Sequence, residues 1–417
     1  MKRLTLWIFG LCAACMTAQA QLTLEECYRA ARENYPLVRQ LGLIERTEEF
    51  TLSNAAKGYL PQLSFSGKAS YQSDVTKIPF SIPGIEPGMD NDQYQLVLEL
   101  NQTIWDGGAI RRRKDEIRAG TDVRKQQVEV SLYALNERVN QLFFGILLLD
   151  AQLEQNALLQ AQLERNHAQV AACLEQGVAS AADLDAVSVE QLNARQTAGE
   201  LKVRRKAYAE VLGWLTGKER LEEAELAVPS GELSDLRQNR RPELELYASQ
   251  RGELAAQEKS LTARYMPRLG LFAQGAYGDP GLNMLKGGFE PYYLAGVRLS
   301  WSIGDLYTRK NDKSLLAVRR NDLDVQEQTF LFNNRMEVTQ YRREVERLDT
   351  LMKNDEELIR LRENIRRAAE AKVQNGTLTV TEMLREVTAE DQARQARALH
   401  RIQRLQALYD MKYATNN

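Results

Sequence analysis

The sequence predicts a mostly α-helical protein with a small β part, and three patterns lead to that fold class. All prolines fall in residues 36–87 and 229–291, which leaves two long proline-free tracts, 88–228 and 292–417. Because proline disrupts helix interiors, these tracts favour long helices. Before each tract, segments alternate apolar and polar residues with the period of a β-strand. Within each tract, apolar residues follow the heptad spacing of a coiled coil.

The composition excludes several classes of protein. The chain has 417 residues, a net charge of −2, 27% charged residues and a mean hydropathy of −0.46. This balanced charge gives no reason to expect nucleic acid as a partner, and the hydropathy excludes a bundle of transmembrane helices. The sequence has no nucleotide-binding, hydrolase-type or metal-ligand motif. We therefore expect no enzymatic activity, no cofactor and no metal site.

The first twenty residues have the features of a secretory signal. Two basic residues precede a mostly apolar stretch, Leu4 to Met16, and Ala18-Gln19-Ala20 is a small-residue cleavage site. We expect residues 1–20 to be a signal peptide that is removed on export. A lipoprotein signal is the alternative, although the residues that precede Cys12 and Cys15 fit it poorly.

The chain also repeats itself. Two pairs of segments share an offset of 199 residues: Leu100–Asp106 with Leu299–Asp305, and Gln176–Ser180 with Asn375–Thr379. We therefore predict two structural repeats, residues 21–230 and 231–417. In each repeat, helical sequence precedes a β-hairpin, and a long helical hairpin follows it. We place the β-hairpins at about residues 62–105 and 268–304, and the helical hairpins at about residues 108–215 and 306–412.

The predicted strands are about ten residues long, which is also the length of a tilted membrane-spanning strand. In the second repeat the apolar face is expected to run from Tyr293 to Trp301 and Ile303, with Arg298 on the other face. An ordinary half-buried hairpin is the alternative. Four strands cannot close a membrane barrel, and open sheet edges do not persist in lipid. If these strands span a membrane, several chains must therefore share one barrel, and three chains would supply twelve strands.

The heptad seams run over Leu135–Leu153 and Val338–Met352. Beyond them the same register becomes polar, with Asn156 in the first repeat and Asp355 and Arg366 in the second. These spacings predict long antiparallel coiled-coil helices.

The order and spacing of these features closely resemble the TolC family of outer-membrane efflux proteins. Four short sequence segments carry the resemblance, together with the two helical turns. The segments are Leu22-Thr23-Leu24-Glu25-Glu26, Asn34-Tyr35-Pro36, Tyr59-Leu60-Pro61-Gln62-Leu63, Trp105-Asp106-Gly107-Gly108, and the turns with Gly177 and Gly376. The duplicated architecture covers almost the whole chain after the signal.

This resemblance implies a homotrimer with a shared 12-stranded β-barrel in the outer membrane and a long α-helical barrel that crosses the periplasm. It implies the exit channel of a tripartite efflux or type I secretion system in a Gram-negative bacterium. The expected partners are outer-membrane lipid, a periplasmic adaptor and an inner-membrane transporter. The alternative is a soluble periplasmic coiled-coil scaffold or adaptor, although an adaptor would normally carry a single helical hairpin.

The resemblance also assigns roles to the ends of the helical hairpins. The residues expected to dock onto the adaptor are Gly177, Val178, Ala179, Gly376, Thr377 and Leu378. Asp183, Glu382 and Arg385 are expected at the pore constriction, where three copies of Glu382 would raise one another's pKa. The simpler reading is that the glycines end their helices and that Glu382 is a solvated carboxylate at a helix start.

The basic run Arg111-Arg112-Arg113-Lys114 directly follows the first predicted hairpin. We interpret it as a solvated helix face, with contact to anionic headgroups as the alternative.

Overall fold

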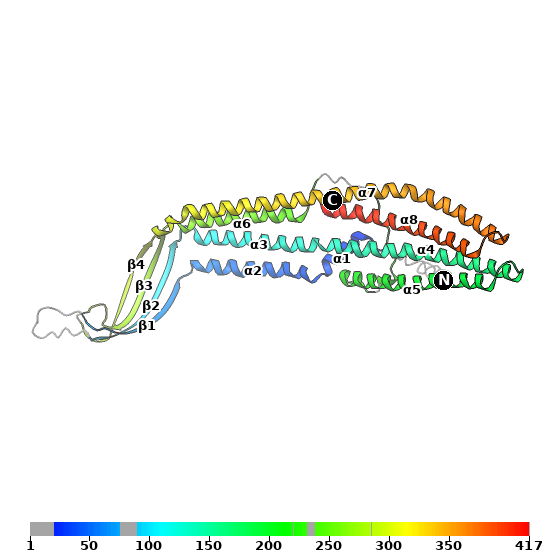
Figure 1. Cartoon of the computed structure of the whole chain (residues 1–417). Helices are drawn as coiled ribbons and strands as arrows, with labels where there is room; N and C mark the ends of the chain where they lie inside the picture. The colour runs from blue at the N-terminus through cyan, green and yellow to red at the C-terminus, as the bar shows by residue number, and fades with distance from the viewer. Residues whose placement is uncertain (1–20, 76–89, 220, 232–237, 285, 417) are drawn as a thin grey trace, which may run out of the picture. The chain divides into compact units, whose positions relative to one another are not determined.

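The computed structural model describes residues 21–75, 90–219, 221–231, 238–284 and 286–416. The predicted signal peptide, residues 1–20, lies outside this part of the chain. The described residues form two compact units. The first unit lies within residues 1–39, 128–242 and 329–417, and the second within 40–127 and 243–328. Each unit takes residues from both predicted repeats, and Figure 1 labels the elements of both.

The second unit contains one antiparallel sheet with the strand order β1-β2-β3-β4. Its strands are β1 (Gln62–Tyr71), β2 (Asp92–Trp105), β3 (Arg268–Asp279) and β4 (Glu290–Ser300). Both predicted hairpins are therefore confirmed. Each hairpin is closed by a long connection, and β2 pairs with β3 to join the two hairpins.

The expected end of the last strand was wrong. Strand β4 ends at Ser300, which pairs with Arg268, the first residue of β3. Beyond that point the chain has no strand to pair with, and it turns into the short 3₁₀ helix η4 (Ile303–Tyr307). The indole Nε1 of Trp301 instead donates a hydrogen bond to the Tyr265 carbonyl at 3.1 Å. Trp301 and Ile303 therefore lie past the strand rather than on its apolar face.

The sheet has one apolar and one polar face, as the alternation predicts. Leu63 lies opposite Leu100, and Leu271 lies opposite Val297, so most apolar side chains of the four strands share a face. Many of them are exposed, including Phe65 at 71% and Tyr293 at 84%. Val97, Phe272 and Leu294 lie on the other face. This other face also carries Ser, Gln, Gly and charged residues, among them the ion pair of Arg298 with Glu99.

Four helices complete the second unit. They are α2 (Arg39–Ala56), α6 (Pro242–Arg264), α3 (Ala109–Tyr133) and the first part of α7 (Arg309–Gln374), with the short 3₁₀ helix η2 (Lys57–Tyr59) after α2. Polar side chains connect neighbouring helices here. Lys125 on α3 pairs with Glu45 on α2, and Arg251 on α6 pairs with Glu327 on α7. Helix α3 follows β2, and α7 follows β4 after the short helix η4 (Figure 1).

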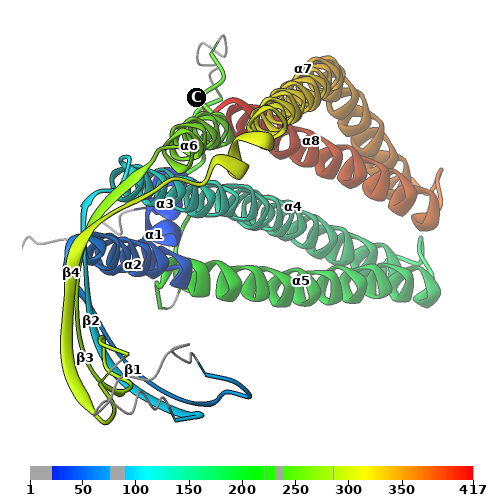
Figure 2. The same ribbon diagram turned by 90° about the vertical axis from the view of Figure 1, so that its left-hand side faces the viewer.

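The first unit is helical. It contains α1 (Leu24–Asn34), α4 (Leu135–Glu175), α5 (Ala181–Thr216), α8 (Val380–Thr415) and the rest of α7, with the short 3₁₀ helices η1 (Pro36–Val38) and η3 (Leu221–Glu223). Helices α4 and α5 form one antiparallel hairpin, and α7 and α8 form the other, which confirms both predicted helical hairpins (Figure 2). The two hairpins pack together along α4 and α8.

Two apolar clusters hold this unit together. One surrounds Phe143 and Phe144 of α4 and includes residues of α1, α5 and α8. The other lies near the hairpin ends around Leu163 and Met383. The stretch Ala109–Glu175 also contains an 18-residue window apolar enough to cross a membrane by length and composition, with a mean hydropathy of 1.2. Because a core helix passes the same test, we assign the apolar character of this stretch to its packing.

The heptad seams are buried where they are apolar and also where they become polar. Val139 and Leu348 are fully buried, as a seam requires. Asn156 is only 3% exposed and Asp355 only 6%. The Asp355 carboxylate lies 2.8 Å from Nδ1 of His400. The polar half of each seam is therefore an interface satisfied by hydrogen bonds rather than a solvated face.

Candidate functional site

The two helical hairpins end in the same backbone turn, which we call the tips (residues 176–180 and 375–379). The φ angles of Gly177 and Gly376 are 74° and 68°, a left-handed conformation that favours glycine. The N–H groups that follow each helix donate back to its last turn, for example Val178 to the Cys173 carbonyl at 2.8 Å. The predicted helix-ending role of both glycines is confirmed.

A capping box begins the returning helix at each tip. Ser180 and Asp183 form it at the start of α5, and Thr379 and Glu382 form it at the start of α8. The Glu382 carboxylate accepts hydrogen bonds from the Thr379 hydroxyl at 2.8 Å and from its N–H at 3.1 Å. These bonds, together with the nearby Arg385 guanidinium, hold the pKa of Glu382 below its ordinary value in the single chain.

The residues predicted to dock onto an adaptor fall into two groups. Gly177, Val178, Gly376 and Thr377 are exposed at the tips. Ala179 and Leu378 instead pack against the apolar cluster around Leu163 and Met383. A Cβ atom on Gly376 would lie 3.4 Å from Cγ1 of Val178, so the two tips are in contact. The structure therefore brings both turns to one end of the first unit.

The three residues predicted at a constriction lie within the first two turns of their helices. Asp183 is half-buried on α5, whereas Glu382 and Arg385 are exposed on α8. Asp183 and Glu382 occupy equivalent positions in their capping boxes. Each carboxylate therefore stabilises a helix start, whatever it does in a pore.

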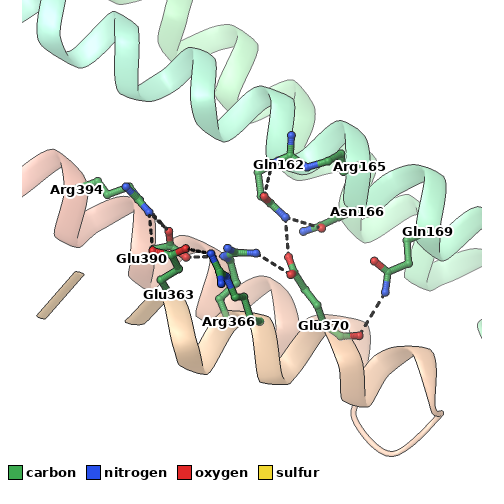
Figure 3. Close-up of polar contacts among 10 residues, drawn as sticks. Gln162, Arg165, Asn166, Gln169, Glu363, Arg366, Glu370, Glu390 and Arg394 are labelled. Carbon is green, nitrogen blue, oxygen red and sulfur yellow. Dashed lines mark hydrogen bonds and ion pairs between the residues drawn. The ribbon is translucent and has the colours of Figure 1, made fainter. Parts of the chain in front are cut away.

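A buried polar cluster near the tips is the feature that sequence reasoning missed. Arg366 of α7 donates to Glu370 on its own helix at 2.7 Å and to Glu390 on α8 at 2.5 Å. Arg394 also pairs with Glu390, at 2.6 Å. Gln162 of α4 donates to Glu370 at 2.6 Å, which connects the first hairpin to the second (Figure 3). The sequence signal for this cluster was Arg366, where the heptad register becomes polar. The other members of the cluster include residues of α8 and α4, which that signal does not reveal.

The electrostatics of the cluster follow from its burial. The Arg366 side chain is 13% exposed and that of Glu390 only 7%. Desolvation opposes the charge of Arg366, but the hydrogen bonds that it donates to Glu390 and Glu370 raise its pKa above the ordinary value. A cavity of about 240 Å³ adjoins these residues. Burial raises the pKa of Asp391 at its edge to about 6.

Comparison with known proteins shows which family the chain is similar to. Residues 27–217 match the model of the outer membrane efflux protein family. Over this segment, a little under half of the chain, the sequence is similar to that family. No curated protein sequence matches the chain. The partial family match and the shared fold are those of outer-membrane efflux channels, and that family is one of channels rather than enzymes.

Three solved structures show how far the fold extends. The outer-membrane channel OprN is 12% identical, with 94% of this chain and 89% of that chain covered and a TM-score of 0.69. CusC is 14% identical, with 95% and 92% covered and a TM-score of 0.70. The outer membrane protein VceC from Vibrio cholerae is 12% identical, with 94% and 96% covered and a TM-score of 0.67. The shared fold thus covers both repeats of this chain.

The motifs that carry the resemblance have local structural roles in this chain. Thr23 and Glu26 form the capping box of α1. The Asn34 side chain donates to the Trp214 carbonyl at 2.9 Å and so caps the end of α5. Asp106 caps α3, because its carboxylate accepts from the N–H groups of Gly108 at 2.9 Å and Ile110 at 2.6 Å.

The second repeat builds its strand-to-helix junction differently. Asp305, the repeat equivalent of Asp106, lies in η4 rather than at the start of α7. At this junction Asp312 is the carboxylate that accepts the hydrogen bonds. It accepts hydrogen bonds from the Thr308 and Tyr265 hydroxyls, both at 2.9 Å. These bonds lower the pKa of Asp312, with the Tyr265 hydrogen bond as the largest cause.

Proposed function

We propose that three copies of this chain form one exit channel, with four strands from each copy closing a shared 12-stranded barrel in the outer membrane. The sheet carries this proposal. One of its faces is apolar and exposed, and β1 and β4 each have only one neighbouring strand among the described residues. In lipid, such edges must pair with another chain, because unpaired backbone groups there cost several kcal/mol each.

Helix α7 supports the association of copies. Exposed apolar residues follow one stripe of this helix at intervals of three and seven residues. They are Leu315, Val318, Val325 and Phe332. This is the spacing of a coiled-coil seam, and a neighbouring copy would bury it.

The channel would serve a tripartite efflux or type I secretion system. We propose that the exposed tip residues Val178 and Thr377 meet a periplasmic adaptor, which connects the channel to an inner-membrane transporter. Three copies of Asp183, Glu382 and Arg385 would surround the periplasmic opening, which is closed at rest. The channel itself conducts passively, because the transporter supplies the free energy.

Export would follow cleavage of residues 1–20 in a Gram-negative cell, with no acyl chain attached. The alternative is a soluble periplasmic scaffold or adaptor. The exposed apolar sheet face disfavours it, because soluble proteins rarely expose such patches.

Cell fractionation followed by purification in detergent tests the proposal. We expect the protein in the outer membrane, with an intact mass that begins at Gln21, and threefold particles in electron-microscopy class averages. A folded monomer in the soluble periplasm would contradict it. An added lipid mass on Cys15 would contradict the signal-peptide part alone.

A further inference from the structure

The helices that leave the sheet, α3 and α7, carry matching pairs of lysine and arginine residues at their starts. Arg111 and Lys114 lie in the first two turns of α3, and Lys310 and Lys313 lie at the offset of 199 on α7. Three of the four are exposed, and Lys114 is half-buried. None of them forms an ion pair with a carboxylate of the described residues. The duplication has therefore kept two neighbouring cations at each of these helix starts.

The intervening cations of α3 differ in this respect. Arg112 pairs with Asp115 at 3.3 Å, and Arg113 pairs with Glu116 at 3.2 Å. Within the basic run, Arg111 and Lys114 are thus the two cations that form no ion pair with a carboxylate of the described residues. Like charges one helical turn apart repel each other, so an external anion would stabilise each pair.

The direction of these side chains follows from two cavities of the second unit. One cavity of about 280 Å³ is lined by polar-face strand residues such as Asn101 and by Ala109 and Ile110 of α3. The side of α3 that carries Ala109 and Ile110 therefore lies next to the polar face of the sheet. Arg113 lies three residues after Ile110 and lines a second cavity on the same side of α3.

Arg111 points away from that side. Two residues correspond to about 200° of helix rotation, so Arg111 and Arg113 face opposite ways. The second cavity is also lined by Arg319 of α7. Lys310 lies nine residues before it, which is two and a half turns, and so faces away from the cavity as well. Arg111 and Lys310 therefore lie on the side that continues the apolar face of the sheet.

The helix direction aims these side chains toward the strands. Cα–Cβ bonds in a helix tilt toward its N-terminus, and α3 and α7 both begin at the sheet. Exposed aromatic rings lie where the strands end and the helices begin. Trp105 is at the end of β2, and Tyr307 is just before α7. Aromatic side chains of this kind collect where a membrane barrel leaves the hydrocarbon. Long cationic side chains at that level extend to the headgroups.

We propose that Arg111, Lys310 and Lys313 form a basic collar that binds the phosphate groups of anionic phospholipids in the periplasmic leaflet. Lys114 is not part of it, because it lies four residues after Ile110 and so on the side of the polar-face cavity. This inference rests on the proposed outer-membrane trimer. Three chains would place nine cations around the base of the barrel. The helices identify the leaflet, since the long loops of a barrel face outward and its helical continuation faces the periplasm.

Lipid retention by the purified full-length trimer tests the collar. Native mass spectrometry would compare phosphatidylglycerol with phosphatidylcholine on the wild type and on the double variant Arg111→Gln with Lys310→Gln. We expect the wild type to prefer phosphatidylglycerol, and the preference to fall about fivefold for each cation removed per chain. High salt should weaken the wild-type preference in the same way.

The matched control is Arg113→Gln with Arg319→Gln, which removes the same charge from the same helices on the opposite side. This control should keep the preference, and Arg111→Lys should keep most of it. Equal loss in the control and the test variant, or no loss in the test variant, would overturn the collar. A stronger preference for lipid A than for phosphatidylglycerol would overturn the assigned leaflet. A wild-type monomer would overturn the proposed function, whereas a trimer without lipid preference overturns the collar alone.

Discussion

Glu382 shows how one carboxylate can serve both a fold and a pore. Its hydrogen bonds with Thr379 complete the capping box of α8, and the predicted pore role depends instead on its charge. A glutamine can keep the capping box but carries no charge. The two roles can therefore be separated by comparing two substitutions at one position.

We expect Glu382→Gln to retain thermal stability and to weaken block by multivalent cations in planar-bilayer conductance. Glu382→Ala should weaken cation block equally and also lower thermal stability, because α8 loses its cap. Arg385→Glu should strengthen cation block. Unchanged block in all three variants would leave Glu382 with the capping role alone.

The lowered pKa of Glu382 also gives a direction for the effect of pH. Its pKa in the folded chain lies below the ordinary value of 4.5. The carboxylate therefore stabilises the fold above about pH 4.5, and this contribution is lost as the pH falls through the lowered folded value. The difference in melting temperature between the wild type and Glu382→Ala should therefore shrink in acid, which a pH series measures directly.

Arg366 is the residue on which the buried cluster depends. It has a carboxylate on each side, Glu370 and Glu390, and little exposure to water. We expect Arg366→Ala to destabilise the protein by about 3 kcal/mol, because two partly buried carboxylates lose a partner. Chemical denaturation checks this value. Arg367→Ala is the matched control, since Arg367 is 67% exposed and should change stability by less than about 1 kcal/mol.

At the scale of elements, the tips combine a rigid turn with an exposed edge. Ala179 and Leu378 anchor the turns in the apolar cluster, and Val178 and Thr377 remain accessible. We therefore propose that docking and folding depend on different residues of the same turn.

We expect Val178→Glu with Thr377→Glu to abolish cross-linking to the cognate adaptor while the channel still assembles. Gln196→Glu provides the control, because it adds charge to an exposed part of α5 away from the tip. In vivo cross-linking measures the contact. Adaptor cross-linking at the wild-type level in the tip variant would show that docking uses another surface.

The duplication is also visible in individual contacts between elements. Asp150 pairs with Arg205 in the first helical hairpin, and Asp349 pairs with Arg404 in the second. Both members of the pair keep the offset of 199 residues. The two hairpins therefore use the same cross-helix ion pair, at the same place in the repeat.

At the scale of the whole molecule, assembly should depend on the exposed stripe of α7. We expect Val318→Glu to weaken the trimer strongly, because it places a charge in a buried seam between copies. Ala317→Glu alters an exposed neighbour outside the stripe and should leave the trimer intact. Light scattering in detergent measures the outcome. A stable Val318→Glu trimer would exclude this stripe as a contact between copies.

The sequence by itself determined the elements that depend on local patterns. Period-two alternation located both β-hairpins, heptad spacing located the helical hairpins, and Gly177 and Gly376 located the tips. Each of these patterns reflects a preference that neighbouring residues satisfy among themselves, so a linear reading was sufficient. The apolar sheet face follows in the same way, because side chains alternate along any strand.

The tertiary structure decided the contacts between distant residues. Strand β4 ends at Ser300 because β3 begins at Arg268, and no local signal marks that limit. Likewise, Asp312 replaces Asp305 at the second junction because Tyr265 and Thr308 reach it. The partners of Arg366 come from helices α7 and α8, and only their packing brings Glu390 within hydrogen-bonding distance. Such pairings depend on which surfaces meet in space, and the spacing of residues along one helix carries no information about the helix that packs against it.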